Sequence, residues 1–227
     1  MLMQPWLSVN GPRNITGRWP LEKRMSNLLN GFRVFWQMVK EEWMSNHMQG
    51  SHTRQVVVER LGNPFWQYNS RIAKEGLVLR FGEFDDLDRI VELERLGYDG
   101  FEAWHYHDFR QDFLANPYAA YIMLDTQEPK SQLIGLIVGR FRARGSHISH
   151  LIVHPEYQRQ GLGSLLLNVW LSCAERLDSP QITLEVRASN QGAQNLYQRH
   201  EYKIIGKRER YYQDNGETAL IMKRWVD

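Results

Sequence analysis

Hydrophobic and polar positions follow different patterns in three successive parts of the chain. Residues 1–20 contain several glycines and prolines and show no period, which is typical of irregular structure. From 21 to 44, large apolar residues recur at steps of three and four, with charged residues between them. That spacing predicts an amphipathic helix. Its apolar face either packs on the domain that follows or docks on a partner or a membrane surface.

Residues 45–53 are polar, and we expect a domain boundary there. The predicted divisions are an N-terminal extension over 1–53, a connecting strand and loop over 54–75, and a main domain over 76–227. In the main domain, turn residues separate runs of alternating or continuous apolar residues. These runs predict strands over 76–81, 118–124, 132–141, 146–153, 181–186, 202–208 and 217–225, with helices over 87–96, 102–115, 161–177 and 190–200. Asp85 and Asp86 are expected to cap the first helix.

The stretch from 151 to 167 combines a strand end, a glycine-bearing turn and a helix start. Pro155 follows the strand end and prevents a strand or helix from continuing. Two glycines let several backbone N–H groups point one way, and the helix dipole adds partial positive charge. Such a turn favours a phosphate or pyrophosphate, or else it merely starts a helix. The strand end is Leu151, Ile152 and Val153, and the turn is Gln158, Arg159, Gln160, Gly161, Leu162, Gly163 and Ser164.

The spacing of this turn differs from the P-loop and from the dinucleotide-binding fingerprint. The pattern Q/R-x-x-G-x-G/A after a strand, here Gln158, Gly161 and Gly163, resembles the pyrophosphate loop of the GNAT acyl-coenzyme A N-acyltransferases. The predicted order of strands and helices over 76–227 resembles that fold as well. The resemblance implies an α/β (α+β) domain with a mixed, splayed sheet flanked by helices, and acetyl-CoA as cosubstrate. It also implies that 151–153 bind the pantetheine arm and that 159–164 hold the pyrophosphate.

A second unit carries residues suited to amide formation from a thioester. The acceptor ammonium must lose a proton, which a carboxylate can take directly or through a water, and an O–H can protonate the leaving thiolate. Glu185 lies between apolar Leu184 and Val186, so it points to the opposite face of its strand. Asn190 is expected to cap the next helix, and Tyr197 lies about two turns along that helix. Glu185 could equally be a solvent-facing strand residue, and Tyr197 a core aromatic.

The run L-E-V-R-x-S-N-x-x-A-x-x-L-Y from 184 to 197 resembles the corresponding run of RimI-type ribosomal-protein alanine N-acetyltransferases. The resemblance implies that Glu185 is the general base, that Tyr197 is the general acid towards the coenzyme A thiolate, and that Asn190 contacts the cofactor. The later R-x-x-Y-Y and A-x-x-M patterns match as well. Tyr211 and Tyr212 therefore either line the peptide cleft or pack between the last two strands. Trp104 is expected to form the opposite wall.

One departure from the family pattern concerns the end of the helix that carries the tyrosine. The family commonly has Leu-Gly-Phe there, whereas this chain has His200-Glu201-Tyr202. The missing glycine predicts a slightly different helix end.

Composition limits the class of protein and the compartment in which it is expected to occur. Of 227 residues, 42% are apolar and 24% charged, which is ordinary for a soluble globular protein. Residues 1–75 carry ten Lys/Arg and five Asp/Glu, a basic excess that suggests a partner but is too small to argue for nucleic acid. Cys173 has no second cysteine to pair with, which fits a reducing compartment. The chain has no run long enough for a membrane span and no signal-peptide pattern.

The prediction is a cytoplasmic, monomeric acetyl-CoA-dependent N-acetyltransferase. Its acceptor would be a protein N-terminal amine, by resemblance the N-terminal alanine of small-subunit ribosomal protein eighteen. The amine would attack the thioester directly. No metal is expected, because the histidines lack a ligand spacing typical of metal sites. The alternatives are an acetyltransferase of a small amine, such as a polyamine or antibiotic, and a weakly catalytic binding module.

Overall fold

The computed structural model describes residues 72, 75–98, 103–127, 129 and 131–226. The expected helix over 21–44, the strand candidate over 54–59 and the boundary near residue 53 lie outside these residues. No helix of the described part is long and apolar enough to cross a membrane.

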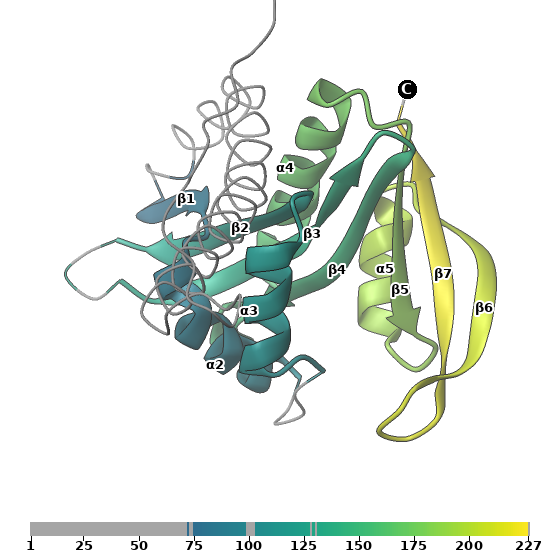
Figure 1. Cartoon of the computed structure of the whole chain (residues 1–227), viewed down its shortest axis with the longest axis horizontal. Helices are drawn as coiled ribbons and strands as arrows, with labels where there is room; N and C mark the ends of the chain where they lie inside the picture. Colours follow the sequence, from purple (N-terminus) through teal and green to yellow (C-terminus); the bar gives the residue numbers. More distant parts are fainter. Residues whose placement is uncertain (1–71, 73–74, 99–102, 128, 130, 227) are drawn as a thin grey trace, which may run out of the picture. The chain divides into compact units, whose positions relative to one another are not determined.

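A seven-stranded mixed sheet forms the centre of the described part (Figure 1). The neighbouring strands β4 and β5 are parallel, and every other neighbouring pair is antiparallel. The pairing of β4 with β5 ends after Ile148–Leu184, and beyond that point the two strands diverge. In spatial order the strands are β1 (Leu77–Phe81), β2 (Ala119–Thr126), β3 (Leu133–Arg142), β4 (Gly145–Val153), β5 (Gln181–Arg187), β7 (Glu217–Trp225) and β6 (Lys203–Tyr212).

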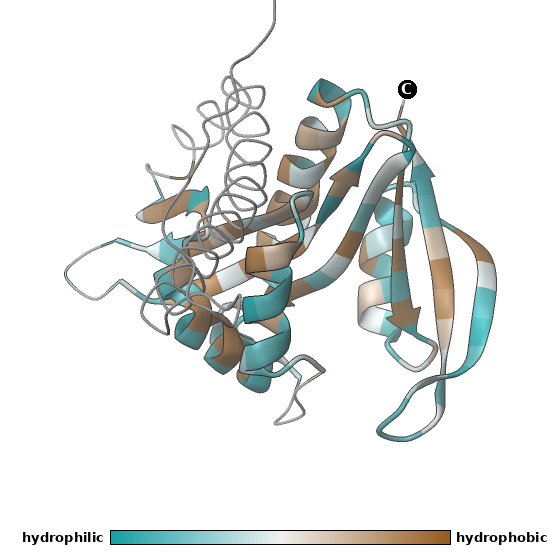
Figure 2. Cartoon of the chain, in the orientation of Figure 1, coloured by the Kyte–Doolittle hydropathy of each residue, from teal (hydrophilic) through white to brown (hydrophobic). Residues whose placement is uncertain are grey.

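Helices cover both faces of this sheet and bury a separate apolar cluster on each. On one face lie α2 (Leu87–Gly97) and α3 (Tyr106–Ala115), whose inward residues include Ile90 and Phe109. On the other lie α4 (Leu162–Arg176) and α5 (Gln191–Arg199). Because β2 and β3 are covered on both faces, they are apolar along almost their whole length. Figure 2 shows mostly polar residues on the outer side of α3.

A β-bulge in β4 changes which residues face which helix layer. Val138 of β3 pairs with His150 and Gly139 pairs with Ile148, so Ser149 is an extra residue on β4. As a result, Ile148 packs in the α4–α5 cluster, whereas Ile152 packs in the α2–α3 cluster. Gly139 is required here, because a Cβ atom at this position would clash with the carbonyl oxygen of His147 and lie 2.9 Å from the Trp170 ring.

The predicted order of elements agrees with the structure, but two boundaries differ. Helix α3 begins at Tyr106. The preceding residues 103–105, which the sequence predicts to be helical, are not helical. Asp108 at its third position accepts a hydrogen bond from the backbone N–H of His105 at 2.9 Å, which completes a capping box. Strand β6 continues to Tyr212 instead of ending at 208, so the tyrosine pair belongs to the strand.

The prediction that Asp85 or Asp86 caps α2 was wrong. Asp86 occupies the N-cap position of α2, but its carboxylate makes no capping hydrogen bond there. The carboxylate instead accepts the backbone N–H of Glu83 at 2.9 Å and pairs with Arg80 at 2.6 Å. Arg89 and Asp125 complete this ion-pair cluster, so Asp86 joins β1 to the start of α2.

The end of α5 departs less from the family pattern than predicted. Glu201 adopts the left-handed conformation, with φ of 64°, that a glycine usually takes at this position. The backbone N–H of Tyr202 then donates to the carbonyl of Tyr197 at 3.0 Å, which closes the helix end.

Candidate active site

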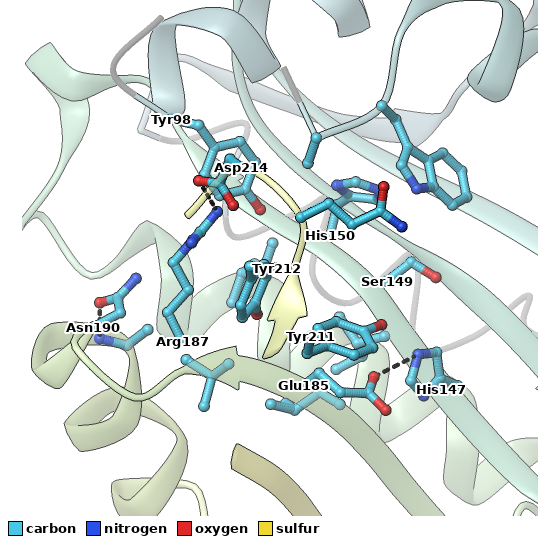
Figure 3. Close-up of a pocket in the computed structure, with 18 of the residues that line it drawn as sticks. Tyr98, His147, Ser149, His150, Glu185, Arg187, Asn190, Tyr211, Tyr212 and Asp214 are labelled. Atoms are coloured by element: carbon cyan, nitrogen blue, oxygen red, sulfur yellow. Dashed lines mark hydrogen bonds and ion pairs between the residues drawn. The ribbon is translucent and has the colours of Figure 1, made fainter. Parts of the chain in front are cut away.

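A cavity of about 1100 Å³ lies where β4 and β5 diverge, on the side of the sheet that carries α2 and α3 (Figure 3). Its walls come from the segment joining α2 to α3, from β3, β4, β5 and α5, and from the end of β6. Seven residues predicted for the site line it together. They are Glu185, Tyr197, Asn190, Leu151, Trp104, Tyr211 and Tyr212. The gap between β4 and β5 lets Tyr197 reach this cavity although α5 covers the other face of the sheet.

Glu185 lies at the centre of this cavity, between two nitrogen-bearing side chains. Strand β5 buries alternate residues, so the side chain of Glu185 faces the cavity, and only 12% of it is exposed. One carboxylate oxygen lies 3.3 Å from Nε2 of His147, and the other lies 3.4 Å from a guanidinium nitrogen of Arg208. His147 contacts Thr183 through its Nδ1, 3.0 Å from Oγ1. The carboxylate is thus held from two sides while it faces the cavity.

His147 is neutral at ordinary pH. Its burial, and then the positive charges of Arg140 and Arg208, lower its pKa from 6.5 to about 4. The contact with Glu185 is therefore one between a carboxylate and an uncharged imidazole. A neutral imidazole can pass a proton along without keeping it.

Tyr197 and Asn190 are both positioned by α5. The side-chain oxygen of Asn190 accepts the backbone N–H of Ala193 at 2.9 Å, which is the predicted N-cap. Tyr197 is buried, and burial followed by the neighbouring Tyr202 and Tyr212 raises its pKa above the usual value for tyrosine. Its hydroxyl consequently keeps its proton at neutral pH and can act as a hydrogen-bond donor.

The glycine turn is separate from the cavity and lies beyond the end of β4. Gly161 has a positive φ of 86° at the N-cap of α4, and nothing described lies within 4 Å of where its Cβ would be. The side chain of Gln158 donates to the carbonyl of Val153 at 3.1 Å, which joins the turn to the strand end. A Cβ on Gly163 would lie 3.1 Å from Leu196 of α5. The turn therefore leaves exposed backbone at the N-terminus of α4, the geometry that suits a pyrophosphate.

The strand end between the cavity and the turn also fits an extended ligand. Residues 151–153 pair with β3 on one side, but they have no partner in β5 on the other. Their backbone groups on the open side can bind the amides of a pantetheine arm. Along the chain, this open strand end lies between the cavity, which Leu151 lines, and the glycine turn.

Aromatic side chains from two segments of the chain line the cavity. Tyr211 and Tyr212 form one wall, packed edge to face with ring centres 5.1 Å apart. The guanidinium of Arg187 lies 3.9 Å from the centre of the Tyr212 ring, and it also binds Asp214 at 2.8 Å. Trp104, from the segment before α3, lines the cavity as well, and its predicted position opposite the tyrosines stays a prediction. Both tyrosines thus line the cavity and contact each other, and their role towards a peptide stays a prediction.

Sequence reasoning missed His147 and His150 as cavity residues. It had considered the histidines only as metal ligands, and the described residues hold no group of three or more side chains suited to a metal. Residues three apart on a regular strand face opposite sides, so their spacing gave no signal. The bulge at Ser149 places both rings on the same face, and it depends on the pairing with Gly139.

Comparison with known proteins places this chain in one family. Residues 92–224 match the family model described as an acetyltransferase (GNAT) domain. A Bacillus subtilis protein named as a [ribosomal protein bS18]-alanine N-acetyltransferase is 32% identical over 67% of this chain and 97% of its own length. The Mycobacterium tuberculosis N-alpha-acetyltransferase RimI is 30% identical over 61% of this chain and 86% of its own.

Among solved structures, a similar one is the ribosomal-protein-S18-alanine N-acetyltransferase from Escherichia coli. It has a TM-score of 0.59 and 26% identity, and the match covers 66% of this chain and 94% of that chain.

Proposed function

This chain belongs to the GNAT acetyltransferase family and is an acyltransferase, and on this premise we propose that it transfers acetyl from acetyl-CoA to the N-terminal amine of a protein. The observation that carries the proposal is the meeting of Glu185, Tyr197 and several aromatic side chains around one cavity, next to the strand end 151–153, which has no partner in β5. The proposed acceptor is the N-terminal alanine of ribosomal protein bS18, as in the name of the Bacillus relative. The proposed location is the cytoplasm, and the proposed state is a monomer.

In the proposed mechanism, Glu185 removes the proton that blocks the acceptor. An N-terminal ammonium has a pKa of roughly 7.7–8.0, so a substantial part of it is protonated at pH 7. Glu185 takes this proton directly or through one water, and His147 lies beside it to pass the proton on. The free amine then attacks the thioester carbonyl carbon, which forms the C–N bond. The nitrogen now carries a positive charge, and it loses its second proton to Glu185 after the first has passed to solvent.

Tyr197 completes the reaction in this proposal. As the tetrahedral intermediate collapses, the C–S bond breaks and the sulfur leaves with its electron pair. Tyr197 gives its hydroxyl proton to that sulfur, and the resulting phenolate regains a proton from solvent or from Glu185. The products are the acetylated N-terminus and coenzyme A.

The segments next to the cavity are proposed to bind the cosubstrate. Residues 151–153 are proposed to bind the pantetheine arm through their open backbone, and residues 158–164 the pyrophosphate through the turn and the start of α4. Asn190 is proposed to contact the pantetheine near the thioester. Trp104, Tyr211 and Tyr212 are proposed to enclose the first residues of the acceptor.

Acetyl transfer to a panel of acceptors tests the proposal. The panel contains peptides beginning with Ala, Ser or Met, a lysine peptide with a blocked N-terminus, and spermidine. Turnover restricted to free N-termini is the expected result. Turnover of only spermidine or the blocked lysine peptide would contradict the proposed acceptor while leaving the acetyltransferase activity in place.

A further inference from the structure

One cationic side chain of the cavity stands next to the proposed base. Arg140 of β3 lines the cavity and is partly buried. It lies directly opposite His147 of β4 in the antiparallel register. The Cβ atoms of two such residues are about 5 Å apart, and both side chains project from the same face of the sheet. Because His147 contacts Glu185, Arg140 belongs to the part of the cavity in which the acceptor amine is proposed to react.

Arg140 has no counter-charge in the described part of the chain. No acidic side chain there forms an ion pair with its guanidinium. Arg187, which also lines the cavity, differs in this respect, because it binds Asp214 at 2.8 Å and Glu217 at 3.2 Å. The carboxylate of Asp108, another lining residue, caps the start of α3. Arg140 therefore keeps hydrogen-bond donors for a ligand in the cavity.

Two further arginines add positive charge at this end of the cavity. Arg208 of β6 lies 3.4 Å from Glu185, and Arg142 is an exposed residue two positions after Arg140 on β3. Burial, and then the charges of Arg140, Arg208 and Arg142, lower the pKa of His147. Among the described residues, Glu185 is the one acid that pairs with any of these three arginines. The excess of positive charge attracts an anionic group.

We propose that Arg140 is a specificity residue of the acceptor site, and that it binds a carboxylate on the second residue of the acceptor. Successive Cα atoms are ~3.8 Å apart, so the second side chain can reach Arg140 while the first residue holds its amine near Glu185. A guanidinium can bind a carboxylate through two parallel hydrogen bonds.

This proposal rests on the proposed N-terminal acceptor and refines it. It ranks acceptors with Asp or Glu at the second position ahead of those with a neutral or basic residue there. The same excess of positive charge disfavours a polyamine, because a polyamine carries several positive charges of its own.

Matched peptides test the preference. All begin with alanine and differ only at the second position, which is Glu, Gln or Lys. Glu and Gln have nearly the same size, so this pair isolates the charge. For the wild type we expect kcat/KM to be roughly tenfold higher for Glu than for Gln, the usual worth of a hydrogen bond to a charged group, and lowest for Lys. A fourth peptide has Gln at the second position and Glu at the fourth, and it should gain no such advantage.

Substitution of Arg140 then assigns the preference to this residue. In Arg140→Gln the ratio of Glu to Gln peptide should fall to about one, with turnover of the Gln peptide retained. Arg140→Lys keeps the charge but loses the paired donors, so it should preserve part of the preference. Arg144→Gln is the matched control, because Arg144 is an exposed residue of the turn after β3 and does not line the cavity. Its ratio should equal that of the wild type.

Four results would overturn the inference. They are equal kcat/KM for the Glu and Gln peptides in the wild type, an unchanged ratio in Arg140→Gln, an equal advantage from Glu at the fourth position, and the same loss of preference in Arg144→Gln. The last two would mean that only the overall charge matters. The proposed function fails in a different way. In that case no N-terminal peptide is acetylated, whereas the blocked lysine peptide or spermidine is.

Discussion

Glu185 shows how much the role of one residue depends on what surrounds it. A strand glutamate with apolar neighbours in sequence is usually a surface residue. Here the splay of β4 from β5 turns its face of the strand into a cavity wall, and His147 and Arg208 hold the two carboxylate oxygens. Removal of its charge should therefore affect proton transfer more than folding or cosubstrate binding.

We expect Glu185→Gln to lower kcat by roughly 100-fold or more, the usual contribution of a general base. The amide keeps the size of the side chain, so the KM for acetyl-CoA should change little. The measurement is steady-state acetylation of an N-terminal peptide, with thermal unfolding as the check on folding. A Glu185→Gln variant with full activity would show that another group removes the proton.

The titration of His147 should not appear in the pH dependence of kcat/KM near neutral pH. Its pKa in the folded protein is about 4, below the usual 6.5, so the imidazole is uncharged throughout pH 6–9. The rise of kcat/KM with pH over that range should instead follow the acceptor amine, with a midpoint of roughly 7.7–8.0.

The variant His147→Gln distinguishes these possibilities. It should lower kcat/KM while leaving the midpoint of the pH profile unchanged. A profile whose midpoint lies near 6.5 in the wild type and disappears in His147→Gln would mean that this imidazole titrates during turnover.

At the scale of elements, the bulge in β4 determines which side chains of this strand face the cavity. It places His147 and His150 on one face, and it exists because β3 offers Gly139 opposite a strand with one extra residue. A side chain at Gly139 would meet the backbone of β4 and the fully buried ring of Trp170, neither of which can move away easily. The bulge is therefore sensitive to a single methyl group.

We expect Gly139→Ala to lower the free energy of unfolding by about 1–3 kcal/mol, the cost of overpacking a core. It should also reduce kcat, because the displaced strand carries His147. Thermal unfolding and peptide acetylation measure the two effects. Gly192→Ala in α5 is the matched control. A Cβ there meets only the Asn190 side-chain oxygen, at 3.7 Å, so stability should stay equal or rise slightly. Equal stability of the two variants would contradict the packing argument.

For the whole molecule, the sequence predicted the parts of the site that depend on local chain geometry. The glycine turn, the Asn190 cap and the alternation around Glu185 need only neighbouring residues, and each has the predicted form in the structure. The order of strands and helices was predictable for the same reason. The roles of Glu185 and Tyr197 in catalysis stay predictions.

Features that depend on contacts between distant segments were not predictable. The bulge requires the pairing of β3 with β4, and the Glu94–His150 pair joins α2 to β4 across 56 positions of sequence. Asp86 was misassigned because its partner Arg80 lies on another element. Burial of two histidines follows from these long-range contacts, and it has a consequence for the stability of the whole domain.

That consequence is a loss of stability in mild acid. The pKa values of His147 and His150 fall from 6.5 to about 4 in the folded protein, chiefly because burial disfavours the charged form. Between these values the unfolded chain binds more protons than the folded one, so stability rises with pH. The stabilisation is complete above pH 6.5 and is lost as pH falls towards 4, by about 3 kcal/mol for one such histidine.

Thermal or urea unfolding between pH 4 and 7 measures this slope. Glu217, whose pKa is lowered from 4.5 to about 2 by hydrogen bonds from Ser189 and Arg187, adds a slope of the same sign below about pH 5, so the contribution of the histidines is read between pH 5 and 6.5. The double variant His147→Gln/His150→Asn replaces both imidazoles with groups that do not titrate. Whatever the stability of this variant at pH 7, its slope between pH 5 and 6.5 should be much smaller than that of the wild type. An equally steep slope would mean that the acid sensitivity arises elsewhere in the chain.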